Sequence, residues 1–406
     1  MNYELTGSLD IEMSESQVDL DAIEFPLVGG GSVHSFAEYF SLPQPSMAYR
    51  LRRIGILILI TWVPLLLLAI VSGHAFTKTI VEIPLLHDPA LFGRYLFVLP
   101  LLELSETLIA ISLPVQARHF LQSDLVTDRE RPRFDAAVQE VLKFRSSNTS
   151  EIVIGILAFI LAICARIYVF DATSSTWEIH QTARTLAGWW YALVSLPVLF
   201  FFLLNWLWIF LLWGLFLFRI SRLDLQLTAT HPDHAGGLGF LGWGLASFST
   251  VLMAIAAMFS SAFFYEIIHN HETLDTLKYH VMAFVVIAIV IIHAPLLVFF
   301  GRLSRCRFAG LLDFSTLVLR YDRKFEEKWI ERKTGETDDS LLGSADIQSL
   351  ADIASAYEHV NDMLLIPFDM KGFAVLVFAA LFPFLPLVAT VVPVQEILKK
   401  LTEMVI

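Results

Sequence analysis

Cysteine is scarce in this chain, which has two, Cys164 and Cys306, among 406 residues. Two cysteines are too few to build a disulfide framework. Cys164 lies inside an apolar run and Cys306 beside an arginine cluster. We therefore expect them in opposite halves of the membrane region, too far apart to pair, and interpret both as packing residues.

Lysine and arginine are missing from the first 49 residues. This segment carries acidic residues instead: Glu4, Asp10, Glu12, Glu15, Asp19, Asp21, Glu24 and Glu38. A signal peptide needs a basic segment followed at once by an apolar core, so we expect no cleavable signal peptide. The formal net charge of −12 owes much to this acidic tail. Because nucleic acid binds basic surfaces, we expect no nucleic-acid partner.

Apolar residues, by contrast, make up 56% of the chain and come in long blocks. Crossing a hydrocarbon layer of about 30 Å takes ~20 helical residues. Seven blocks are long enough, near residues 54–72, 94–114, 151–170, 187–218, 241–266, 280–300 and 372–393. We predict an all-α, polytopic helical membrane protein with seven transmembrane helices and the lipid bilayer as its partner. Pro197 and the length of the fourth block predict a tilted or kinked helix there.

The segments between these blocks alternate between rich and poor in lysine and arginine. Rich segments precede the first block and follow the second, fourth and sixth blocks. Such segments stay in the cytoplasm. The alternation therefore predicts a cytoplasmic N-terminus and a C-terminus on the outer side of the membrane, and an even number of spans would break it.

This threading divides the chain into four regions. Residues 1–49 form an acidic cytoplasmic tail. Residues 50–300 form a membrane domain with six spans and a cytoplasmic helical loop near 115–150. Residues 301–371 form a cytoplasmic helical region, and residues 372–406 hold the seventh span and a C-terminal helix lying in the periplasmic interface.

The stretch THPDHAGGLGFLGWG, residues 230–244, contains the spacing G-x-G-x-x-G in Gly237, Gly239 and Gly242. A dinucleotide fingerprint with this spacing follows a strand and belongs to a βαβ unit. Here the blocks on both sides are transmembrane helices. The sequence therefore does not favour a dinucleotide site.

We interpret the same stretch as a packing element. Asp233 is a candidate N-cap of the fifth helix. Gly236, Gly239 and Gly242 would let a neighbouring helix approach closely. The alternative is an anion site at this positive helix N-terminus, formed by Arg219, Arg222, His231 and His234.

Three strings, THPDHAGGLGFL, LLGSADIQSLADI and LFPFLPLV, together resemble a family of multi-pass bacterial inner-membrane proteins with no assigned activity. The resemblance covers most of the chain from about residue 50 onward. It implies a bacterial multi-pass protein and assigns no catalytic or binding residue.

Two carboxyl groups in the second block give the strongest indication of function. Glu103 and Glu106 lie one helical turn apart on one face, and a charged carboxylate inside a membrane is usually neutral, paired or in contact with water. At 1.5 Å per residue, Glu106 and His293 lie at similar depths of about 18 and 20 Å. We predict that Glu103, Glu106 and His293 form an intramembrane proton or cation site. The alternative is a hydrogen-bonded cluster that fastens helices.

Histidines form a second group, at the outer face in this topology: His74, His87, His180, His269, His271 and His280. Among them His269, His271 and His280 are weak candidates for metal ligands, because a separation of two residues is common in metal sites. Scattered loop histidines are more often solvated. We expect no cofactor.

The sequence favours a channel or transporter for protons, cations or a small solute over an enzyme. Two alternatives stay open. One is a membrane-embedded signalling or assembly scaffold working through the tail and the cytoplasmic helices, and the other is a metal-dependent membrane enzyme using the outer-face histidines. A homo-oligomer is left open as a further partner.

The lysine and arginine alternation predicts the location of both termini. A reporter that is active only in the periplasm should be active when fused to the C-terminus and silent when fused to the N-terminus. Reporter activity in bacterial cells measures this directly. The reverse pattern would contradict the seven-span threading.

Overall fold

The computed structural model describes residues 47–76, 83–168, 176–180, 183–331 and 345–388. Within these ranges seven helical segments are long and apolar enough to cross a membrane: Ala48–Val71, Pro89–Gln122, Asn148–Arg166, Leu186–Ile220, Gly239–His269, Leu274–Ile330 and Met370–Val388. The predicted all-α class with seven spans is confirmed. The acidic tail up to residue 46 and the predicted C-terminal interfacial helix lie outside the described residues.

The first three spans are built as follows. The first is α3 (Met47–Thr61) and α4 (Val63–Val71), and the second is α5 (Pro89–Phe92), the π-helix η2 (Gly93–Val98) and α6 (Leu99–Gln122). The amphipathic α7 (Arg131–Arg145) then leads to the third span, α8 (Asn148–Tyr168). Two antiparallel strands of two residues each follow, β1 (Ile179–His180) and β2 (Ala183–Arg184), with Ile179 opposite Arg184.

The remaining spans complete the bundle. The fourth is α9 (Leu186–Trp190), the π-helix η3 (Tyr191–Ser195) and α10 (Leu196–Ile220), and the fifth is α11 (Gly239–Gly244), η4 (Leu245–Phe248) and α12 (Ser249–His269). The sixth is α13 (Leu274–His293), η5 (Ala294–Phe299), α14 (Phe300–Phe325) and η6 (Glu326–Ile330). After α15 (Ala345–Asn361), the seventh is α16 (Met370–Leu381), η7 (Phe382–Phe384) and α17 (Leu385–Val388).

The fourth span contacts several neighbours, and α10 packs against α6, α7 and α8. Fully buried aromatic rings join these helices: Trp213 and Phe216 of α10 stack at 5.2 Å, and Phe120 and Phe134 meet Phe216 edge-on. The π-helix η3 ends just before Pro197. Proline has no N–H to donate, so this distortion lies where the sequence predicts one.

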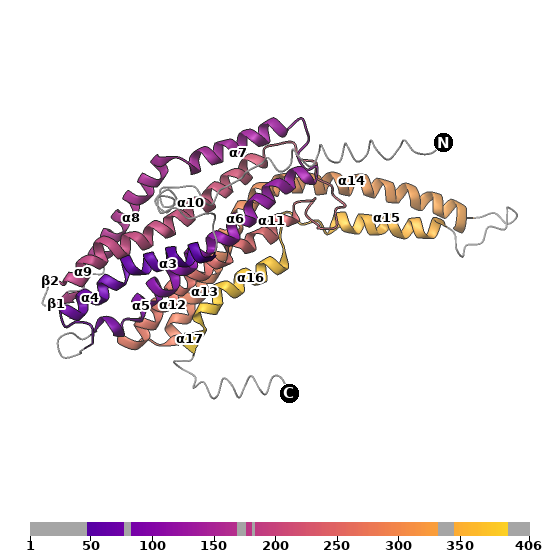
Figure 1. Ribbon diagram of the computed structural model, residues 1–406. Helices are drawn as coiled ribbons and strands as arrows, with labels where there is room; N and C mark the ends of the chain where they lie inside the picture. The colour runs from indigo at the N-terminus through magenta and orange to yellow at the C-terminus, as the bar shows by residue number, and fades with distance from the viewer. Residues whose placement is uncertain (1–46, 77–82, 169–175, 181–182, 332–344, 389–406) are drawn as a thin grey trace, which may run out of the picture.

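The sixth span continues far beyond the bundle, and α15 returns beside it as a helical hairpin (Figure 1). The Arg307 guanidinium donates to the Asn361 carbonyl at 2.6 Å, and the Tyr321 hydroxyl donates to the Asp346 carbonyl at 3.0 Å. We call this side of the bundle the hairpin end. The opposite side, with β1 and β2, is the strand end.

The glycine stretch lies at the hairpin end, and Gly242 has a close neighbour there. A Cβ on Gly242 would stand 2.8 Å from the Asp369 nitrogen and 2.9 Å from the Pro367 oxygen. These are backbone atoms of the segment just before the seventh span. Gly242 therefore lets α11 approach that segment more closely than any side chain would allow.

Replacing Gly242 with alanine should lower the free energy of unfolding by about 1–3 kcal/mol, because the backbone must move to admit the methyl group. Thermal unfolding in detergent measures the change. Gly155 of α8 is a matched control, since a Cβ there meets nothing within 4 Å. Gly155→Ala should leave stability unchanged or slightly raised, and an equal loss in both variants would contradict the packing role.

Candidate functional site

Two pairs of side chains face each other between α3 and α6. Arg50 and Arg53 lie three residues apart on α3, and Glu103 and Glu106 lie three residues apart on α6, so each pair shares a helix face. Arg53 Nε lies 2.8 Å from Glu103 Oε1, and Arg53 NH1 lies 3.2 Å from Glu106 Oε2. Arg50 donates to the Thr107 hydroxyl. Arg53, Glu103 and Glu106 are called the ionic triad below.

The depth of the ionic triad follows from where its helices begin and end. The second span starts at Pro89, so Glu106 lies about 26 Å along it at 1.5 Å per residue. Arg53 lies about 27 Å from Val71, at the strand end of the first span. The glutamates are therefore closer to the hairpin end than the sequence analysis placed them, and level with Arg53.

The two carboxylates of the ionic triad differ in exposure. The Glu103 side chain is 1% exposed, whereas that of Glu106 is 24% exposed and that of Arg53 is 15% exposed. The Tyr49 ring lies 5.8 Å from the Arg53 guanidinium. The Glu103 carboxylate is thus buried beside the Arg53 guanidinium, while the Glu106 carboxylate is partly exposed.

A further cation lies within electrostatic reach of the ionic triad, at the junction of α7 and α8. Burial lowers the pKa of Arg145, and the negative charges of Glu151 and Glu106 oppose that shift. The charged groups at this end of the bundle therefore act on one another across α3, α6 and the α7–α8 junction.

His293, the third predicted member of the site, has other neighbours. Its Nδ1 is paired with the Ile289 carbonyl at 2.8 Å, and its ring lies against Phe368 and Phe373 at 5.9 and 6.0 Å. Equal depth in the membrane does not determine which way a helix face points. The structure therefore joins the two glutamates to Arg53, and His293 to an aromatic cluster.

The four residues of the predicted anion site do not gather at one point. Arg219 pairs with Glu140 at 2.6 Å, and His231 pairs with Asp233 at 2.8 Å. The His234 ring lies beside that of His359, with centroids 5.2 Å apart and the ring planes tilted by 33°. The Arg222 guanidinium lies over the Phe218 ring of α10, 4.8 Å from its centroid.

Asp233 itself occupies the cluster of backbone donors in the glycine stretch. Its Oδ1 accepts from the N–H groups of Ala235 and Gly237 at 2.8 and 3.1 Å, and its Oδ2 accepts from Gly239 at 2.7 Å. Burial raises the pKa of this carboxyl, but these N–H donors and His231 outweigh burial and hold the pKa below its usual value. The Asp233 carboxylate thus occupies the backbone N–H groups at the start of α11 that an external anion would need.

Three glycines of this loop occupy positions that disfavour a side chain. Gly236 and Gly237 have φ values of 66° and 97°, which favour residues without a Cβ. Gly239, the first residue of α11, lies against Asp233, whose Cβ would be 2.9 Å from a Cβ on Gly239. Helix α11 begins six residues after its capping carboxylate, instead of directly after it as the N-cap interpretation of Asp233 supposed.

The three candidate metal ligands have separate neighbours. His269 Nε2 lies 3.0 Å from the His87 carbonyl, and His280 Nδ1 lies 3.3 Å from the Thr276 carbonyl. His271 has a positive φ of 56°. In the part of the chain that the structure describes, no three His, Cys, Asp or Glu side chains lie together in a way that could hold a metal ion.

A polar cluster at the strand end was missed by sequence reasoning. Arg166 pairs with Glu178 at 2.6 Å, and Arg94 donates to the Tyr191 hydroxyl at 2.6 Å. Burial raises the pKa of Glu178, and the Arg166 charge opposes this shift. Arg166, at the end of the third span, is thus held by a carboxylate from the segment just before β1.

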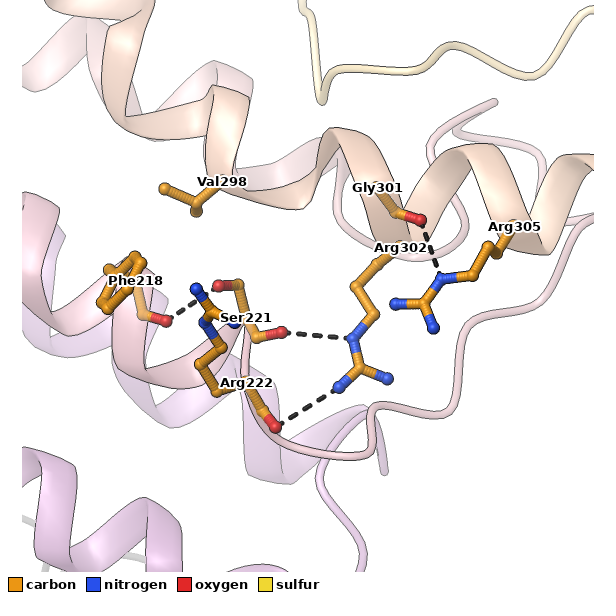
Figure 2. A pocket seen from close by; sticks show the side chains of 7 residues that line it. All are labelled: Phe218, Ser221, Arg222, Val298, Gly301, Arg302 and Arg305. Carbon is orange, nitrogen blue, oxygen red and sulfur yellow. Dashed lines mark hydrogen bonds between the residues drawn. The ribbon is translucent and has the colours of Figure 1, made fainter.

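A second missed feature is an arginine-lined pocket at the hairpin end. Its volume is about 320 Å³, and Figure 2 shows it between the end of α10 and the start of α14. The lining residues are Phe218, Ser221, Arg222, Val298, Gly301, Arg302 and Arg305. The string GRLSRCR indicated a basic segment after the sixth span, but not its meeting with Arg222.

No family model, curated protein or solved structure matches this chain. The function is therefore inferred from the geometry of the described residues.

Removing Glu103 should test how the ionic triad holds α3 against α6. Glu103→Gln keeps the shape and an oxygen acceptor for Arg53, whereas Glu103→Leu leaves that guanidinium without its partner at 2.8 Å. The leucine variant should unfold more readily than the glutamine variant by about 1–3 kcal/mol, measured by thermal unfolding in detergent.

The more exposed pair of Glu140 and Arg219, whose side chains are 35% and 46% exposed, supplies the control. Exposed pairs contribute about 0–1 kcal/mol, so Glu140→Leu should have a smaller effect than Glu103→Leu. Equal stability of Glu103→Gln and Glu103→Leu would contradict the fastening role.

Proposed function

We propose that this multi-pass membrane protein is a channel or transporter for protons or small cations, with Glu103 and Glu106 as its ionisable site. One observation supports this proposal above the others. In direct contact, two carboxylates share the single guanidinium of Arg53, and one of the two, Glu106, is 24% exposed.

Fastening two helices does not require this arrangement. A buried ion pair adds little stability compared with well-packed apolar residues, because both charges lose their hydration. One arginine and one glutamate would already satisfy each other. A second carboxylate, partly open and beside the first, adds a group that can exchange a proton or hold a cation.

Location forms part of the same proposal. We place the N-terminus in the cytoplasm on the basis of the lysine and arginine alternation, and the protein in a bacterial inner membrane on the basis of the family resemblance. The hairpin end is then cytoplasmic. The resemblance to a multi-pass bacterial family supports the same location.

Flux measurements on purified protein in lipid vesicles test the proposal. A trapped pH-sensitive dye reports proton entry under an imposed potential, and a trapped cation-sensitive dye reports cation entry. The parent protein should carry one of these fluxes above protein-free vesicles. Glu106→Gln removes the open ionisable group and should return the flux to the level of protein-free vesicles.

Glu140→Gln is the matched control, because Glu140 has the same chemistry but lies on α7, outside the spans, where it pairs with Arg219 from the last turn of the fourth span. Its flux should equal that of the parent. A parent protein with no flux, or an unchanged flux in both Glu103→Gln and Glu106→Gln, would remove the conduit proposal.

A scaffold is the second candidate, and the helical hairpin favours it. On α14 the side chains of Phe308, Leu312 and Leu319 share one face and are 65%, 56% and 52% exposed. Helix α14 runs from the bundle into the helical hairpin (Figure 1). Exposed apolar faces of this kind often contact other proteins, including further copies of the same chain, so this becomes the leading function if the parent carries no flux.

A further inference from the structure

The arginine-lined pocket at the hairpin end has a cationic side and an apolar side. Arg222 follows the end of α10, while Arg302 and Arg305 lie near the start of α14. Phe218 and Val298 supply the apolar wall. Each arginine lies four or seven residues further toward the hairpin end than the apolar residue on its own helix, about 6–10 Å along the axis.

The depth of the pocket can be counted along the sixth span, which starts at Leu274. Val298 lies about 36 Å from that start and Arg302 about 42 Å, at 1.5 Å per residue. A bilayer is about 40–45 Å thick with its headgroup layers, around a hydrocarbon core of about 30 Å. The arginines are therefore in the headgroup layer at the hairpin end, and the apolar wall lies deeper.

Arg302 is held in place by the protein itself. Its Nε donates to the Ser221 carbonyl at 3.2 Å and its NH2 donates to the Arg222 carbonyl at 3.3 Å (Figure 2). The acid nearest to it is Asp224, 3.7 Å from its NH1, whose side chain is 89% exposed. Arg302 is therefore a fixed cation in the pocket wall, with little negative charge to oppose it.

The other two guanidinium groups keep most of their donors. Arg305 uses Nε for the Gly301 carbonyl at 3.1 Å, and its terminal nitrogens have no hydrogen-bond partner among the described residues. The Arg222 guanidinium lies over the Phe218 ring at 4.8 Å, an arrangement that orients it without using its N–H groups. A Cβ on Gly301 would meet nothing within 4 Å.

We propose that this pocket binds the phosphate-bearing headgroup of an anionic phospholipid. An arginine guanidinium can donate two hydrogen bonds to two oxygens of one phosphate group. Basic pockets between transmembrane helices bind such headgroups. The arginines would hold the phosphate in the headgroup layer, and Phe218 and Val298 would contact the start of an acyl chain. A free phosphate shares the charge but not the apolar part.

Binding of phosphatidylglycerol to the purified full-length chain in neutral detergent tests the proposal. Phosphatidylcholine, which is zwitterionic, and inorganic phosphate are the comparison ligands. Arg222→Gln combined with Arg305→Gln removes two pocket cations and leaves Arg302 in its structural contacts. This double variant should weaken phosphatidylglycerol binding by about thirtyfold, the effect expected for two arginines near an anionic headgroup.

Arg320→Gln combined with Arg323→Gln is the matched control, because it removes the same charge from the exposed part of α14 away from the pocket. Its affinity should equal that of the parent. Equal losses in both double variants would show non-specific surface attraction and overturn the proposal. So would equal binding of phosphatidylcholine, an absence of lipid binding, or binding of inorganic phosphate as strong as that of the lipid.

A second substitution distinguishes binding inside the pocket from attraction by charge alone. Gly301→Leu adds bulk at the pocket wall without changing any charge, and leucine is a good helix former. It should weaken phosphatidylglycerol binding while thermal stability without lipid is retained. An unchanged affinity in this variant would show that the headgroup does not enter the pocket.

Discussion

The cost of leaving a charge unpaired in hydrocarbon governs how the first two spans meet. Arg53 enters the bundle on α3, and its guanidinium has two carboxylates of α6 beside it. Because Arg50 and Arg53 share one face of α3 and Glu103 and Glu106 share one face of α6, a single orientation of the two helices satisfies these groups together. Rotating either helix would expose a charge to lipid or leave it unpaired.

The same constraint acts at the strand end with different residues. Arg166 near the end of the third span is neutralised by Glu178 from the β1 segment, and Trp177 donates to Asp88 at 3.0 Å. Asp88 also caps α5 through the N–H groups of Ala90 and Leu91. Charged groups at this end thus hold the segment around β1 against the end of α8 and the start of α5.

At the hairpin end the glycine stretch joins three parts of the chain. Asp233 satisfies the backbone donors at the start of α11, and Gly242 lets α11 approach the segment before the seventh span. The Leu364 N–H donates to the His234 carbonyl at 2.6 Å and ties the end of the hairpin to the same loop. The arginine-lined pocket lies at this end as well. Of its three arginines, Arg222 and Arg305 keep their terminal N–H groups free, within the described part of the chain, to bind a ligand.

The seven spans and the helical class could be predicted from sequence, because in lipid an isolated chain segment satisfies its backbone only as a helix. The length of each apolar block then determines whether it crosses. The pairing of Glu103 with Glu106 followed from helical periodicity in the same way. Their partner did not: sequence counting yields depth but not the direction of a helix face, so it selected His293 at a similar depth.

Tertiary structure decided which distant residues meet. Arg53 lies in the arginine-rich segment just before the first apolar block, and α3 begins early enough to carry it into the bundle. Arg222 and Arg302 are 80 residues apart and share a pocket because the end of α10 packs beside the start of α14. Local sequence determines where each helix lies along the chain and how deep its residues lie in the membrane. The packing of side chains between helices determines the rotation of each helix and its neighbours. Rotation and neighbours together decide which residues form a site.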